Sequence, residues 1–457
     1  MATSLPVMQS DLQPAAGGRA RFRASYDRVR DRSVQLHQRL KPKRLYAPSL
    51  DWANFLIADV RGALGPYVVV YLVTEQHWQL APVGLVTTLG GWIGLVMQTP
   101  IGAWLDHTNR KRGLLLGALG VLSLGALILA LTPSFWPVLL ANSMMQVVSG
   151  VFEPAVAALT VGLCARDALT RRMGRNAAWA RAGNIVVAGT SGFAAWVFTA
   201  RAVFLQVPLI ALLTAIAVLT IPHEKVDLRR ARGLKQEKEQ RDGPVGWLTL
   251  FRSRPMLVFG ACSLLYELAD APLLTLVSQQ IGVEHEGWGA TVTSTFIVAA
   301  QLGMLVTSIL VGRRADAWGY RWLLAVGFAL LPVQAALTVL SHKVYWLTLV
   351  QFVGGLGGGL FAALTPLWLA DATRGTGRYN LSQGAMGTLR AVGVTSSGLL
   401  SEMLVDRLGY NAAYAGCGVI GALAVALLWF ALPDPQATEH PTADEAPRAT
   451  FTKRGLT

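Results

Sequence analysis

Charged residues are scarce in this chain. They make up 14% of the 457 residues, whereas soluble domains typically carry roughly 25%. Hydrophobic residues account for 53%, which argues against an ordinary soluble protein and indicates a surface that faces lipid. The charges are mainly basic, with 40 Lys and Arg against 26 Asp and Glu. Because they stand between hydrophobic runs and not on one patch, we expect no nucleic-acid partner.

Residues that usually build metal, redox or nucleotide sites are equally sparse. The three cysteines, Cys164, Cys262 and Cys417, lie far apart in or beside apolar runs, so they indicate neither a disulfide framework nor a metal site. All seven histidines fall in the tails or between apolar runs, so haem is not expected. No P-loop is present, and the glycines from Gly354 to Gly359 lie inside an apolar run, where they predict close helix packing. We expect no cofactor, no ATP-driven step in this chain and no enzymatic activity.

What the chain has in abundance is long apolar runs. A membrane-crossing helix needs about 20 mostly apolar residues, and twelve runs meet that length. They lie at 51–73, 81–105, 113–131, 137–161, 181–200, 202–221, 256–278, 289–312, 322–340, 345–369, 381–403 and 412–432. The sequence therefore predicts an all-α integral membrane protein of twelve transmembrane helices.

A hydrophilic, densely charged stretch near the midpoint divides the runs into two sets of six. We expect five segments: a basic tail (1–49), a six-helix bundle (50–221), a central loop (222–255), a second six-helix bundle (256–433) and a polar tail (434–457). Lys and Arg concentrate in the tails, the central loop and every second short loop, and such loops stay in the cytoplasm. Both termini are therefore expected in the cytoplasm, with the chain in the inner (cytoplasmic) membrane.

The two halves repeat a motif in register. The first half has Gly102, Asp106 and Lys111, followed by Arg112, and the second has Gly312, Asp316 and Arg321 exactly where the repeat would place them, 210 positions later. A second repeated pair is Gly174-Arg175-Asn176 and Gly377-Arg378-Tyr379-Asn380. This repetition predicts pseudo-symmetric bundles.

The Gly-x-x-x-Asp-basic loop after the second and eighth helices resembles the signature of the major facilitator superfamily, from about residue 50 to 433. The resemblance implies a transporter whose helices 1, 4, 7 and 10 line a central cavity. It departs from the family pattern at Asn109, where Gly is usual, and at Gln146, where drug-exporting members carry an arginine. The missing arginine casts doubt on a simple drug/proton antiporter. Residues 377–384 also resemble a bacterial branch of the family. This second resemblance does not indicate a substrate.

The repeated loops predict a conformational latch. Glycines let two helices approach closely, and an aspartate is favourable at a helix N-terminus. The latch residues would be Gly102, Asp106, Lys111, Arg112, Gly312, Asp316, Arg321, Arg175 and Arg378. Topogenic charge that merely orients the loops is the alternative interpretation.

Ionisable residues inside a membrane helix are costly and usually face the bundle interior. The candidates for substrate binding or proton coupling are Asp59, Arg61, Glu153, Glu267, Asp270 and Arg390, with the amides Gln146 and Gln351. Glu267 and Asp270 are three positions apart and share a helix face, and Asp59 aligns with Asp270 between the halves. The arginines could instead simply neutralise some of these acids.

Together these features predict a secondary active transporter that moves a small organic molecule by alternating access, with protons as coupling ion and export as the direction. A buried carboxylate can exchange a proton when burial disfavours its charged form. Uptake of a small metabolite, or a non-transporting sensor with the same fold, remains an alternative. The expected partners are the substrate, protons and the lipid bilayer, and the protein is expected to be a monomer.

Overall fold

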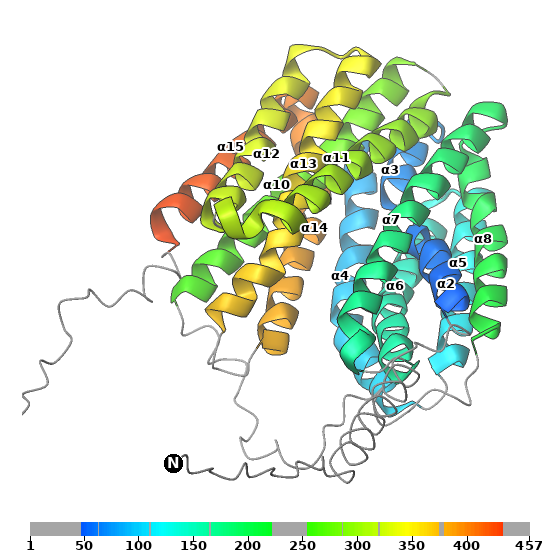
Figure 1. Cartoon of the computed structure of the whole chain (residues 1–457). Helices are drawn as coiled ribbons and strands as arrows, with labels where there is room; N and C mark the ends of the chain where they lie inside the picture. Colours follow the sequence, from blue (N-terminus) through cyan, green and yellow to red (C-terminus); the bar gives the residue numbers. More distant parts are fainter. Residues whose placement is uncertain are drawn as a thin grey trace, which may run out of the picture.

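The computed structural model describes residues 47–432, apart from residues 63, 109–110, 164–165, 222–253, 286, 319 and 374–378. The described residues form thirteen helices and no strand (Figure 1). The helices are α2 (Ala47–Gly62), α3 (Leu64–Thr74), α4 (Leu80–His107), α5 (Lys111–Leu131), α6 (Phe135–Leu163), α7 (Arg166–Val197), α8 (Arg201–Leu219), α10 (Arg254–Glu284), α11 (Gly289–Trp318), α12 (Tyr320–Leu340), α13 (Val344–Ala372), α14 (Tyr379–Leu408) and α15 (Tyr410–Ala431).

Within the described part of the chain, nine of these helices are long and apolar enough to cross a membrane. The other four are α2 and α3, which are individually short, and α7 and α14, which carry more polar residues. Along α8, a row of large apolar side chains is exposed, including Leu205, Leu209, Leu212 and Ile216. A row of this kind would be costly in water and suits contact with lipid tails.

The helices pack into two halves, each with its own apolar core. In the first half, α4 and α5 pack on α6, and α2 packs on α7 and α8. In the second half, α10 packs on α14 and α15, while α13 packs on α11 and α12. One buried apolar cluster lies mainly among α2–α8 and the other among α10–α15. The predicted all-helical membrane fold in two bundles is confirmed.

The run 51–73 corresponds to α2, which ends at Gly62, and α3, which begins at Leu64, while residue 63 lies outside the described part of the chain. One predicted span boundary was wrong. The fifth span was expected from residue 181, but α7 begins at Arg166, so arginines assigned to a loop lie on a helix.

Candidate functional site

A cavity of about 810 Å³ lies between the two halves. Its walls come from α3, α4, α5 and α6 of the first half and from α10 and α14 of the second. Gly65 and Pro66, at the start of α3, are part of the wall. The first residues of α3 therefore face the cavity.

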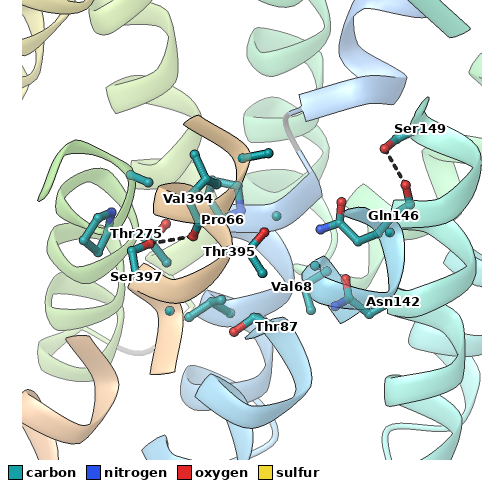
Figure 2. Close-up of a pocket in the computed structure, with 18 of the residues that line it drawn as sticks. Pro66, Val68, Thr87, Asn142, Gln146, Ser149, Thr275, Val394, Thr395 and Ser397 are labelled. Carbon is teal, nitrogen blue, oxygen red and sulfur yellow. Dashed lines mark hydrogen bonds between the residues drawn. The ribbon is translucent and has the colours of Figure 1, made fainter. Parts of the chain in front are cut away.

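Two amides on α6 form one wall. Asn142 and Gln146 stand one helical turn apart and project toward Val68 and Thr395 (Figure 2). The Asn142 amide donates a hydrogen bond to the Val86 carbonyl oxygen at 3.0 Å, which fixes its orientation. α4 can come this close because of Gly90, where an added Cβ would lie 2.3 Å from Asn142 Nδ2. The predicted binding candidate Gln146 thus lines the cavity.

The opposite wall, on α14, carries hydroxyls and one acid. Thr395, Ser397, Ser401 and Glu402 all line the cavity. The Ser397 hydroxyl donates to the Val394 carbonyl oxygen at 2.8 Å, as Figure 2 shows. Among the described residues that line the cavity, Glu402 is the one that is ionisable. Glu402 was not selected as a candidate from the sequence. It falls at the edge of the predicted span 381–403, and an acid is common where a helix leaves the membrane.

At one end the cavity is closed by contacts between α4 and α14, which we call the α4–α14 seam (Gly84, Thr87, Thr88, Gly398 and Leu399). The Leu399 N–H donates to the Thr88 hydroxyl at 3.0 Å. A Cβ added at Gly84 would lie 3.0 Å from the Leu399 Cα, so the backbones almost touch. The seam is built from uncharged groups, which separate at a smaller electrostatic cost than ion pairs do.

Further contacts between the halves lie at the same end. The Tyr67 and Ser294 hydroxyls of α3 and α11 are hydrogen-bonded at 2.6 Å, and Thr291 donates to the Gly192 carbonyl oxygen of α7 at 3.4 Å. These residues stand near the ends of α4 and α14 that form the seam. Toward the other ends, α4 and α14 diverge in Figure 1. The halves are thus joined at one end of the cavity.

The acids predicted on α10 lie beside the arginine of α14. Arg390 Nε donates to Glu267 Oε1 at 2.6 Å, and a second guanidinium nitrogen reaches the same oxygen. Asp270 is half-buried one turn further along α10. None of the three is among the residues that line the cavity, although Ala271, next to Asp270, is. The structure therefore brings Glu267 and Arg390 together as an ion pair within the second half.

Gln351 lies away from the cavity. It is buried on α13, and its Oε1 accepts a hydrogen bond from Gln334 of α12 at 3.2 Å. A Cβ added at Gly354 would clash with the Gln334 amide. This arrangement fits a hydrogen bond that joins two tightly packed helices.

An ion-pair cluster joins α2 to α7. Asp51, buried near the start of α2, contacts Arg172 at 2.8 Å and accepts hydrogen bonds from Arg175, including one at 3.0 Å from its Nε. Asp51 was not selected in the sequence because its partners are more than 100 positions away. The predicted latch residue Arg175 is thus bound inside the first half.

The structure describes few contacts of the remaining predicted site residues. Arg112 donates to the Leu219 carbonyl oxygen at 2.6 Å, at the junction of α5 and α8. Arg378 lies outside the described residues. The side chains of nine others lie outside the described part, so their roles stay predictions: Asp59, Arg61, Gly102, Asp106, Lys111, Glu153, Gly312, Asp316 and Arg321.

Comparisons with known proteins agree with this architecture. The family model described as Major Facilitator Superfamily matches residues 50–284 and 271–456. An uncharacterised MFS-type transporter of Mycobacterium tuberculosis is 36% identical over 389 residues, which cover 85% of this chain and 93% of that protein. A second uncharacterised MFS-type transporter from the same species is 29% identical over 147 residues, covering 31% of this chain and 32% of that protein.

Two solved structures share the fold. The nucleoside transporter NupG superposes with a TM-score of 0.64 at 14% identity, covering 84% of this chain and 97% of that one. A POT family transporter in complex with a thioalcohol-conjugated peptide gives 0.63 at 13% identity, covering 84% and 94%. At such identities the likeness concerns the fold alone. With the duplicated motif, the two-bundle fold and the family match in place, this chain belongs to the major facilitator superfamily and is a membrane transporter, not an enzyme.

Proposed function

We propose that this protein moves a small organic molecule by alternating access, with protons as the coupling ion and export as the direction. The observation that carries the proposal is the cavity between the halves, closed at one end by the uncharged α4–α14 seam. A cavity of about 810 Å³ is of the size that holds a small organic ligand. Separating the seam while the opposite ends approach would expose the same cavity to the other side.

The basic loops set the proposed orientation. Lys and Arg favour the cytoplasmic side, so both termini would be cytoplasmic and the seam would close the cavity toward the outside. The structure would then be the inward-facing state, in the inner (cytoplasmic) membrane.

Cysteine labelling of intact cells tests this orientation. Ser134 and Glu284 are exposed at the seam end of the helices, and Asp371 is exposed at the opposite end of α13. Cysteines introduced at Ser134 and Glu284 should react with a membrane-impermeant maleimide, and one at Asp371 should react only after the cells are opened. The reverse pattern would show that the protein is inserted the other way.

Proton coupling is the second part of the proposal. Asp59, Glu153, Glu267 and Asp270 are the intramembrane acids that could carry the proton, with Arg61 and Arg390 as counter-charges. In proteoliposomes with an imposed pH gradient, a substrate found by thermal-shift screening should accumulate against its own gradient. Accumulation should fail when the coupling acid is replaced by Asn or Gln, while exchange of substrate without a gradient persists.

The same measurement separates the alternatives. Accumulation in the opposite direction would identify an importer. Absence of any transport by a protein that binds its ligand would favour a sensor. Undiminished accumulation in Asp59→Asn, Glu153→Gln, Glu267→Gln and Asp270→Asn would contradict coupling through these residues.

A further inference from the structure

Glu402 combines features that the coupling candidates do not share. It lines the cavity, yet only 3% of its surface is exposed, so its carboxylate meets the cavity from a recess in the wall. Gly84 of α4 leaves this space, because an added Cβ there would lie 3.1 Å from the Glu402 Cβ. The acid therefore stands at the closed end of the cavity, directly behind the seam.

Glu402 is held by a neutral side chain of α10. Its Oε2 accepts one hydrogen bond, from Gln279 Nε2 at 3.2 Å. Gln279 is fully buried, and its own Oε1 has no hydrogen-bond partner. The Glu402 carboxylate is thus bound by a neutral amide, and the carbonyl oxygen of that amide is itself unmatched.

None of the described residues that line the cavity carries a positive charge: no Lys, Arg or His is among them. Arg390, on the same helix as Glu402, is bound to Glu267 and does not line the cavity. In a recess shielded from water, a carboxyl group with no counter-charge among the described residues is stabilised in its ionised form by a bound cation and not by a bound anion.

From these observations we propose that the cavity binds a small organic cation, with the Glu402 carboxylate as its counter-charge at the closed end. Apolar and amide groups, among them Val68, Met145 and Gln146, would contact the uncharged body of the ligand. This inference rests on the proposed function and adds the class of substrate to it. Because Glu402 lies next to the α4–α14 seam, the bound cation would lie where the two halves must separate.

Two ions of matched shape and opposite charge test the proposal. Tetraphenylphosphonium and tetraphenylborate differ mainly in the sign of their charge, so a comparison of their binding isolates the electrostatic effect. Saturable binding of each to purified protein in detergent would be measured by equilibrium dialysis with excess unlabelled competitor. We expect the wild-type protein to bind the phosphonium about tenfold or more tightly than the borate.

Glu402→Gln keeps the size of the side chain and removes its charge. We expect this variant to bind tetraphenylphosphonium about tenfold or more weakly than the wild type. Glu284→Gln, which removes an exposed acid of α10 outside the cavity, should leave the affinity unchanged. The proposal is overturned if Glu402→Gln binds the phosphonium like the wild type, if the borate binds as tightly, or if the wild type shows no saturable phosphonium binding.

Failure of this inference can be told apart from failure of the proposed function, because binding in detergent requires no gradient. Phosphonium binding that depends on Glu402, without accumulation in response to a pH gradient, would retain the cation site and contradict proton coupling. Gradient-driven accumulation of another substrate with undiminished phosphonium binding by Glu402→Gln would contradict the cation site alone.

Discussion

Replacing Arg390 with alanine should destabilise the protein. Glu267 is 12% exposed at its side chain and receives two contacts from the Arg390 guanidinium. The Arg390 side chain is 37% exposed, so the pair is only partly buried. Removing one partner therefore leaves a charge uncompensated at a cost of about 1–3 kcal/mol, between the values for exposed and buried pairs. The loss would be an appreciable part of the net stability of a folded protein, which is about 5–15 kcal/mol.

The guanidinium also joins a third helix. Its central carbon lies 4.9 Å from the centre of the Phe361 ring of α13, a distance at which a cation is attracted by an aromatic face. Phe361 in turn packs on Tyr266 of α10, with the ring centres 4.5 Å apart. Arg390→Ala therefore removes contacts among α10, α13 and α14 as well as the charge partner.

Thermal unfolding of the purified variants measures the effect. Arg390→Ala should give a lower Tm, and the double variant Glu267→Gln/Arg390→Gln should recover most of the loss because no charge is left unpaired. Lys343→Ala is the control, since Lys343 lies at 5.9 Å over the exposed ring of Tyr345. An Arg390→Ala protein that unfolds at the wild-type temperature would show that the pair is not needed for the fold.

Much of the fold could be predicted from the sequence, because length and hydropathy of each run are local properties. The early start of α7 was not visible, since the buried partner of its arginines, Asp51, belongs to another helix.

The site was harder to predict than the fold. Gln146 could be placed in the cavity because its helix was expected to face the centre. Arg390 contacts Glu267, which is the geometry expected of a neutralising partner, the alternative to its prediction as a coupling residue. Gln351 has the same side chain as Gln146 but faces α12, and residue type alone cannot tell the two apart. Glu402 escaped notice because it stands one residue before the predicted end of its span, and helix ends inferred from hydropathy are uncertain by a few residues. The helix in fact continues to Leu408, so Glu402 lies inside it.

We propose that the halves must part at the α4–α14 seam for transport to occur. A Cβ added at Gly398 would lie 3.7 Å from the Thr87 Cβ, which is within the range found for disulfides, about 3.5–4.5 Å. Thr87→Cys with Gly398→Cys, in a background in which Cys164, Cys262 and Cys417 are alanine, should therefore crosslink on mild oxidation. The bond would hold the seam closed.

The matched control lies inside one half. A Cβ added at Gly418 of α15 would lie 3.3 Å from the Ala335 Cβ of α12, so Ala335→Cys with Gly418→Cys can crosslink two helices that are expected to move together. Oxidation of this pair should leave transport intact. Transport by the reduced form of each variant shows that the substitutions themselves are tolerated.

Transport in proteoliposomes before oxidation, after oxidation and after reduction is the most direct measurement. Oxidation of the Thr87→Cys/Gly398→Cys protein should abolish transport, and reduction should restore it, because alternating access requires the seam to open. Full crosslinking of the seam with transport undiminished would contradict the account.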